Sequence, residues 1–381
     1  MPASVFAGNT PATIIADIDP GGVERDTIQV CLPESAPKGD VVFIFDDTGS
    51  MGPVIGTVKA KAGTIMTGVR GAIPDTNFGV GTFVDYPASY DSFGYDDIYG
   101  EDPDYAWKTD LDLTSDTGDV QTALDGIGLF FGADIPQNYA RALYEARFYS
   151  WRPDAKKIVV LFGDAPPHAG PGGCIQDGGP FTCPSYPTDN GPYGGDPGRD
   201  EIMGNGDDLS YVDVVAQLAA NNIIVLGVNS GPTTGNAATN FNYMSAETGG
   251  TAFAFTDETI DDQIISIISE ISTEPVDLTL KVREPEYASW VTWSPEGYDD
   301  VEPGECNTFD VTITVPADAS GGSHTFHIDS LGDGVVVGTT TVTKHVSGEI
   351  PAPEFPTIAL PIAMIIGLAF VVISVRSRKD N

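Results

Sequence analysis

Basic residues are scarce in this chain, which carries 18 lysines and arginines against 55 aspartates and glutamates and has a net charge of −37. A surface of this sign repels the phosphates of nucleic acid and of anionic membranes, so we expect no nucleic-acid partner. Cations are attracted instead. The acidic residues are spread through loops, which suits a soluble surface in high salt or in a Ca²⁺-rich exterior. Plain solubility accounts for most of them.

Cysteine is also rare, with four residues in all. An even number fits two disulfides, and four free thiols are the alternative. Cys174 and Cys183 bracket a short loop and form the easier pair, which leaves Cys31 with Cys306. Disulfides of this kind indicate an oxidising compartment.

Long hydrophobic runs are absent apart from residues 357–375, which precede the basic tail 376–381. The run is just long enough to span a bilayer, and the basic tail predicts a cytoplasmic C-terminus. The Pro-Glu-Phe triplet at 353–355, in the linker 347–356, resembles the sorting signal of archaeal surface proteins, which an archaeosortase-type enzyme cuts. The alternative is an ordinary single-span membrane anchor. Both predict a cell-surface, extracellular protein attached through its C-terminus.

The sharpest signal in the sequence lies at residues 41–50. Residues 41–45 are all apolar and predict a buried strand, and Asp46, Thr48 and Ser50 follow it around a glycine that permits a tight turn. Open α/β sheets bind ligands at the carboxyl ends of their strands, so these three oxygen donors fall where such a fold places its site. Carboxylate and hydroxyl oxygens suit a hard cation, and Mg²⁺ is the expected occupant.

Asp46, Thr48 and Ser50 resemble the metal-ion-dependent adhesion site of von Willebrand factor A domains, of which the integrin β-subunit type is most similar. The Asp-x-Thr-x-Ser pattern is short, so its context decides its weight. Gly-Ala-Asp-Ile-Pro-Gln at 132–137 is similar to the turn that supplies further ligands in that family. Asp164, at the end of another apolar strand, begins a loop that resembles the third metal loop. Three segments in the right order are more specific than any one of them.

The resemblance implies a site for Mg²⁺ or Mn²⁺ in which Thr48 and Ser50 bind the metal directly. Asp46 and Asp164 are expected to hold it partly through water. Gln137 stands where the family often has a carboxylate, so it offers a neutral oxygen and leaves the cation more electrophilic. The open coordination position then accepts an Asp or Glu carboxylate of a protein partner.

The same resemblance implies a second, flanking Ca²⁺ held by Asp85, Asp134 and the carbonyl of Pro136. Gly132 supplies no side chain at this place, which weakens the expectation. A third site is not expected, because residues 53–54 lack the acidic side chains that the integrin type has there.

The order of elements predicts an α/β fold with a doubly wound, mostly parallel sheet, followed by a β-sandwich and a transmembrane segment. We assign residues 38–273 to a von Willebrand factor A domain, and residues 274–346, which alternate with period two, to an immunoglobulin-like or hybrid-like sandwich. Residues 12–37 alternate as well and are expected to complete the sandwich. Residues 1–11 are a signal remnant or a flexible start.

Three local predictions bear on the site. Residues 138–149 are expected to form a helix with Phe148 in the core. Residues 86–110 lack periodicity and are expected to form an elaborated loop. Residues 169–208 are expected to form an insertion on the metal-bearing face.

Catalytic constellations are lacking. No serine, histidine and aspartate surround a nucleophile elbow, and no glycine loop of the phosphate-cradling type is present. The segment from Asp46 resembles the Asp-Lys-Thr-Gly motif of haloacid-dehalogenase-like phosphatases, but Asp47 takes the lysine position and would repel phosphate. The sequence therefore predicts a metal-dependent adhesion or protein-binding module and no enzyme. The alternatives are a structural surface-coat protein whose metal only stabilises the fold and, less favoured, a Mg²⁺-dependent phosphatase-like enzyme.

Overall fold

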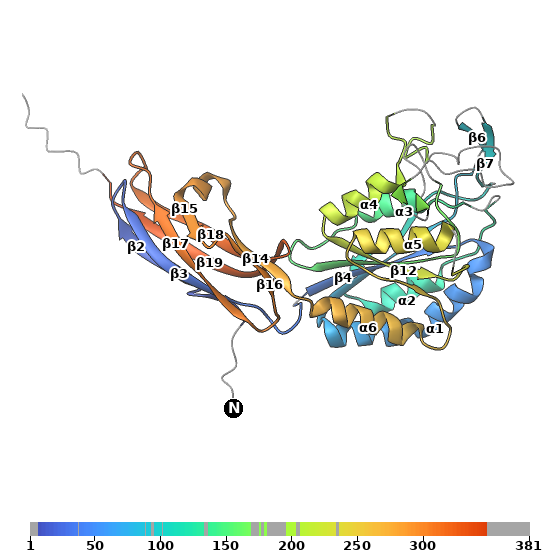
Figure 1. Cartoon of the computed structure of the whole chain (residues 1–381), viewed down its shortest axis with the longest axis horizontal. Coiled ribbons are helices and arrows are strands. Elements are labelled where there is room, and N and C mark those ends of the chain that lie inside the picture. Colours follow the sequence, from blue (N-terminus) through green and yellow to red (C-terminus); the bar gives the residue numbers. More distant parts are fainter. Residues whose placement is uncertain are drawn as a thin grey trace, which may run out of the picture.

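The computed structural model describes residues 7–36, 38–87, 89–92, 95–100, 102–132, 136–168, 175–176, 179–180, 196–202, 206–233 and 236–348. The chain is elongated, with a part made mainly of strands at one end, which includes the short 3-10 helix η2 (Pro285–Trp290), and a part that carries the α-helices at the other (Figure 1). The predicted disulfide between Cys174 and Cys183, the predicted ligand Asp134 and the predicted membrane span at 357–375 all lie outside the described residues.

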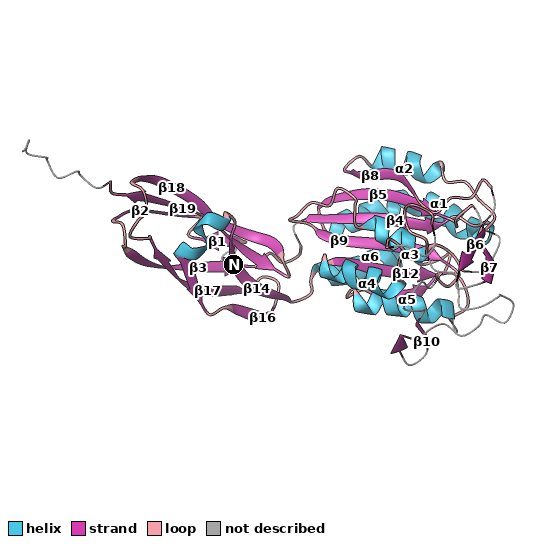
Figure 2. Ribbon diagram, turned by 90° about the horizontal axis from the view of Figure 1, so that it is seen from above, coloured by secondary structure: helices cyan, strands magenta, loops and turns pink. Residues whose placement is uncertain are grey.

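The helix-bearing part is built on a six-stranded sheet with the order β13-β12-β9-β4-β5-β8 (Figure 2). Its strands are β4 (Lys38–Asp46), β5 (Asp75–Phe83), β8 (Lys108–Thr114), β9 (Lys156–Gly163), β12 (Ile223–Asn229) and β13 (Ala252–Ala254). Five of them run parallel, and β8 at the edge runs antiparallel to β5. The apolar residues 41–45 of the central β4 are fully buried, as expected for a strand covered on both faces.

Helices cover both faces of this sheet (Figures 1 and 2). One face carries α1 (Gly52–Ala72), α2 (Thr117–Asp125) and α6 (Ile260–Ser272), and the other carries α3 (Tyr139–Ala146), α4 (Tyr211–Ala220) and α5 (Asn236–Glu247). Successive side chains of a strand point to opposite faces, so β4 contributes to both cores. Val41, Phe43 and Phe45 pack with the first set of helices, and Val42 and Ile44 with the second.

The other part consists of two sheets with the orders β1-β3-β17-β15 and β16-β14-β18-β19-β2. The strands are β1 (Gly8–Thr10), β2 (Thr13–Ile18), β3 (Val23–Cys31), β14 (Val276–Val282), β15 (Val291–Ser294), β16 (Gly297–Val301), β17 (Cys306–Thr314), β18 (Gly322–Gly332) and β19 (Val335–Val346). Apolar side chains from both sheets share one core. The N-terminal β3 pairs with β17, and β2 pairs with β19, so the two ends of the described chain lie in the same sheets.

The predicted disulfide between Cys31 and Cys306 is confirmed. The two residues are register partners on the neighbouring strands β3 and β17, with Cα atoms 4.0 Å apart. The bond therefore joins positions 275 residues apart in sequence within one sheet.

The predicted fold class is wrong and needs correction. In the described part of the chain, strand residues outnumber helical residues and antiparallel pairings outnumber parallel ones, so the protein is β-rich with mixed sheets and is not a doubly wound α/β chain. The prediction gave too much weight to the apolar parallel strands and too little to the long ladders outside them. No helix among the described residues is long and apolar enough to cross a membrane.

Two local predictions also need correction. Phe148 is 56% exposed, because α3 ends at Ala146 and the residue falls beyond its buried face. The segment 86–110 is not a loop throughout, since β6 (Ser89–Ser92) and β7 (Tyr95–Ile98) form a hairpin and β8 begins at Lys108. Hairpins of this length lack enough alternation to be recognised in sequence.

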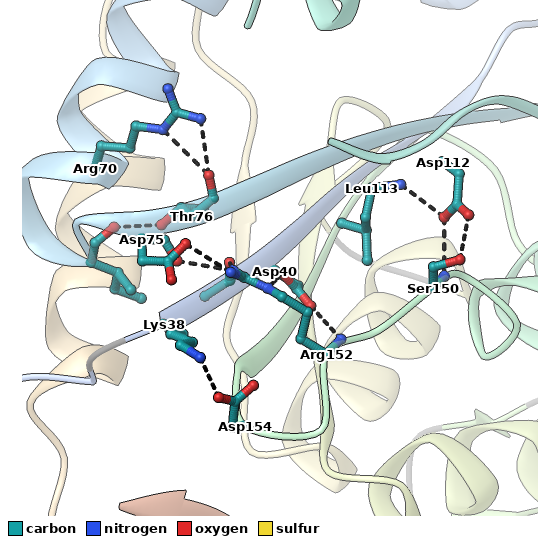
Figure 3. Close-up of polar contacts among 12 residues, drawn as sticks. Lys38, Asp40, Arg70, Asp75, Thr76, Asp112, Leu113, Ser150, Arg152 and Asp154 are labelled. Carbon is teal, nitrogen blue, oxygen red and sulfur yellow. Dashed lines mark hydrogen bonds and ion pairs between the residues drawn. The ribbon is translucent and has the colours of Figure 1, made fainter. Parts of the chain in front are cut away.

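A network of charged groups holds the amino ends of the parallel strands (Figure 3). Arg152 donates to both carboxylate oxygens of the fully buried Asp40, at 2.7 and 2.8 Å, and to Asp75 at 2.7 Å. Burial raises the pKa of Asp40, and the hydrogen bonds and charge of Arg152 oppose that rise. Lys38 pairs with Asp154 beside it. This end of the sheet is therefore stabilised by structural ion pairs.

Candidate functional site

The carboxyl ends of β4, β5 and β9 meet at the opposite end of the sheet. β4 begins at the connection from β3, so its carboxyl end points away from the two sheets of the strand-rich part (Figure 2). β4 ends at Asp46, β9 ends directly before Asp164, and β5 leads into Asp85. Because the three strands are parallel neighbours, the acidic residues at or after their carboxyl ends lie at the same end of the sheet.

Asp46 organises the first loop of the site. It is fully buried, and its Oδ1 accepts hydrogen bonds from the backbone N–H of Thr48 at 3.0 Å and from Thr48 Oγ1 at 2.7 Å. Thr48 Oγ1 lies 3.2 Å from Ser50 Oγ. Ser50 and its neighbour Gly49 are exposed, whereas Thr48 is only 5% exposed. The three oxygen donors thus run from the core of the sheet to solvent.

Tyr139, at the start of α3, connects Asp46 to the Asp164 loop. Its hydroxyl donates to Asp46 Oδ2 at 3.1 Å and accepts the backbone N–H groups of Asp164 and Ala165 at 3.1 and 3.2 Å. Gly163 is needed for this approach, because a Cβ there would lie 2.1 Å from the Tyr139 hydroxyl. The side chain of Tyr139 therefore positions two of the predicted metal ligands together.

The charge of Asp164 acts on the buried Asp46 carboxylate. Burial raises the pKa of Asp46 to about 7, and the nearby charge of Asp164 adds to the rise, whereas hydrogen bonds from Thr48 and Tyr139 oppose it. A cation beside both groups would remove this repulsion.

A surface crevice lies above these residues. Its lining comprises Thr48, Gly49, Ser50, Leu129, Phe130, Phe131, Gln137, Asp164 and Ala165. Gln137 is buried, and its backbone is bonded to the Asp164 loop: its N–H donates to Pro166 O at 3.0 Å, and its carbonyl accepts from His168 N at 3.0 Å. The structure thus brings together all five residues predicted for the primary site. Four of them line the crevice, and Asp46 does not line it but is hydrogen-bonded to Thr48, which does.

Two of the residues predicted to bind a second cation, Asp85 and Pro136, are buried and do not line the crevice. Asp85 is fully buried, its Oδ2 lies 2.7 Å from His168 Nε2, and its Oδ1 accepts the N–H of Tyr86 at 2.7 Å. Pro136 is buried as well. Asp85 is therefore bonded to an imidazole from the Asp164 loop, and the flanking Ca²⁺ stays a prediction.

Sequence reasoning missed a second buried acidic group beside the site. Asp47 is 1% exposed, its Oδ2 accepts from the Tyr105 hydroxyl at 2.5 Å, and its Oδ1 has no hydrogen-bond partner among the residues that the structure describes. The Tyr105 hydroxyl also lies 2.7 Å from Thr82 Oγ1. Burial raises the pKa of Asp47 to about 8, with smaller contributions from Asp46 and Asp110. No local sequence pattern indicates this contact, because Asp47 and Tyr105 lie 58 positions apart.

The donors at the crevice fit a hard divalent cation. They are carboxylate, hydroxyl and amide oxygens, the set that Mg²⁺ and Mn²⁺ prefer, and the repelling pair Asp46 and Asp164 would be stabilised by positive charge. Among the described residues, no group of three or more histidines, cysteines, aspartates or glutamates is gathered closely enough to hold a metal. Cation binding here would therefore depend on Thr48 and Ser50 as well as on the two carboxylates.

Comparison with known protein families gives a match near the C-terminus. Residues 352–372 match the PEF-CTERM archaeal protein sorting domain. This match supports an archaeal cell-surface protein that is anchored or processed at its C-terminus, and it implies a sorting enzyme as a processing partner. No curated protein matches the chain.

Two solved structures show weak likeness to the chain. Proximal thread matrix protein 1 from the mussel byssus has a TM-score of 0.37 at 13% identity and covers 64% of this chain. The pilus adhesin SpaC from Lactobacillus rhamnosus GG, in an open conformation, has a TM-score of 0.39 at 13% identity and covers 85% of this chain. The matched regions span 48% and 45% of those proteins, about half of each.

Proposed function

We propose that this chain is a cell-surface adhesion module that binds a protein partner through a divalent cation. Mg²⁺ or Mn²⁺ is held at the crevice lined by Thr48, Ser50, Gln137 and Asp164, with Asp46 beneath it. The observation that carries the proposal is that oxygen donors from three separate segments line one crevice. The resemblance of these segments to the metal-ion-dependent adhesion site of von Willebrand factor A proteins supports it.

The role of each residue follows from its environment. When bound, the cation supplies an electrophilic centre with an open coordination position for a carboxylate of the partner. Thr48 and Ser50 present uncharged hydroxyl oxygens at the crevice, and Gln137 presents an uncharged amide. Uncharged donors leave more of the positive charge to be met by an Asp or Glu of the partner. Asp46 is held in place by Thr48 and Tyr139 before any partner arrives.

The proposal is tested by calorimetric titration of Mg²⁺, Mn²⁺ and Ca²⁺ into the full-length chain in mild detergent. We expect Mg²⁺ and Mn²⁺ to bind in the micromolar to millimolar range, and Asp46→Ala and Asp164→Ala each to abolish binding. Asp318→Ala removes an exposed carboxylate from the β-sheet part and serves as the charge-matched control.

The outcomes test the cation site on which adhesion depends. Loss of binding in both site variants, with the control unchanged, supports that site and justifies a search for a metal-dependent protein ligand. A folded wild-type chain that binds no cation excludes the adhesion mechanism and favours a structural surface-coat protein. Cation binding that survives both substitutions would place the metal elsewhere in the chain.

A further inference from the structure

Two large apolar side chains stand exposed beside the crevice. Leu129 is 53% exposed and Phe131 is 75% exposed, and both line the crevice together with Phe130. The other exposed large apolar side chains in the described part of the chain line no part of the crevice; they are Ile15, Val23, Phe148 and Ile202. Exposed apolar groups gathered at a polar site mark a contact surface more often than scattered ones do.

The backbone that carries these side chains is held in place. The N–H of Phe130 donates to the Asp47 carbonyl at 2.9 Å, and the N–H groups of Phe131 and Gly132 donate to the buried Asp104 carboxylate at 3.2 and 3.1 Å. The half-buried ring of Phe130 packs edge-on against Tyr105, with centroids 5.0 Å apart. The exposed positions of Leu129 and Phe131 are therefore preorganised.

Residues 129–132 also lie close to the segment that carries Thr48 and to Gln137. Gly132 has a φ of +57°, and a Cβ there would lie 3.2 Å from Thr48 Cγ2 and 2.9 Å from Gln137 Nε2. A Cβ on Gly52 would lie 3.1 Å from Leu129 Cδ1. These close contacts set the distance between the apolar side chains and the oxygen donors of the crevice.

We infer that Leu129 and Phe131 form an apolar rim that selects a partner segment in which the metal-binding carboxylate is flanked by a large apolar residue. This inference rests on the proposed function and names the partner's chemistry. A chain of net charge −37 repels a polyacidic segment, so a single carboxylate between apolar neighbours is the better match. Rigid aromatic and aliphatic anchors beside a polar centre are the groups that carry binding energy at interfaces.

The test uses fluorescein-labelled heptapeptides with one central Asp and measures anisotropy with the full-length chain in Mg²⁺. One series carries Phe or Leu on one side, the other side or both sides of the Asp, and the reference peptide carries Ser on both. We expect the best apolar-flanked peptide to bind about tenfold more tightly than the reference. Phe131→Ser and Leu129→Ser should remove that preference. Phe148→Ser, at a comparably exposed position away from the crevice, should leave it intact.

Failure of the inference and failure of the proposed function give different results. Equal Mg²⁺-dependent binding of all peptides, or a preference that survives Phe131→Ser and Leu129→Ser together, overturns the rim but leaves the adhesion site. Mg²⁺ bound in calorimetry with no peptide bound at millimolar concentration overturns the rim as well. A chain that binds no Mg²⁺ overturns the proposed function itself. Mg²⁺ affinity should be unchanged in both rim variants, which shows that they fold.

Discussion

The hydroxyl of Tyr139 lies 3.1 Å from Asp46 Oδ2 and joins the end of β4 to the loop that begins at Asp164. β4 and β9 are parallel neighbours, and the Tyr139 hydroxyl is bonded to the residues at or just beyond their carboxyl ends. Tyr139 is buried and comes from the first turn of α3. The geometry of the candidate metal site therefore depends on a side chain that would not itself bind the metal.

We expect Tyr139→Phe to destabilise the chain by about 1–3 kcal/mol and to weaken Mg²⁺ binding. The substitution leaves Asp46 Oδ2 and the N–H groups of Asp164 and Ala165 without their buried partner. Denaturant unfolding and calorimetry measure the two effects. Tyr243→Phe, which removes a hydroxyl from a half-buried ring on α5, is the control and should change neither. Unaltered Mg²⁺ affinity in Tyr139→Phe would contradict the positioning role.

Gly163→Ala should weaken the site although it adds only a methyl group. The added Cβ would lie 2.1 Å from the Tyr139 hydroxyl, so either the ring or the end of β9 must move. We expect a loss of about 1–3 kcal/mol in the free energy of unfolding. Gly56→Ala in α1 is the matched control, since no described atom outside the adjacent residues and the backbone of its own helix lies within 4 Å of its Cβ position, and it should stabilise the helix by about 0.5–1 kcal/mol. If both variants shifted stability in the same direction, the steric explanation would be wrong.

At the opposite end of the sheet, Arg152→Gln should cost about 3–5 kcal/mol. Asp40 is fully buried and would lose its charged partner (Figure 3). The double variant Arg152→Gln with Asp40→Asn should recover part of that loss, because no buried charge is left behind. Lys38→Gln removes the partly exposed pair with Asp154 and should cost less than about 1 kcal/mol. Urea unfolding gives all three values, and a double variant no more stable than the single one would refute this account.

Stability should fall in acid through Glu145. Burial raises the pKa of this carboxyl, but Arg199 and Arg141 lower it more, so the net shift is downward. A group whose pKa is lower in the folded state stabilises it above the unfolded pKa and loses that contribution as pH falls through the folded pKa. Glu145→Gln should therefore cost about 1–2 kcal/mol at pH 7, since Arg199 is half exposed, and nearly nothing near pH 2. Thermal unfolding across this range measures the difference, and a pH-independent difference would rule out the linkage.

Some features of this protein follow from local sequence alone. The apolar run at 41–45 predicts a buried strand because only a strand covered on both faces tolerates five consecutive apolar residues there. The oxygen donors after it, and Asp164 after a second such strand, indicate a site at the carboxyl edge. The signal at 353–355 is equally local, and the sorting-domain match at 352–372 agrees with it.

Other features depended on contacts between distant residues. The β-rich character of the whole chain arises from ladders such as β3 with β17, whose partners lie far apart in sequence. Tyr139, Asp47 and Asp104 acquire their roles only when folding brings their partners within hydrogen-bond distance. The exposure of Phe131 could not be predicted either, because the sequence does not show whether an apolar side chain faces the core or the solvent. Sequence specifies which groups are available, whereas hydrogen bonding and packing across the folded chain decide which of them meet.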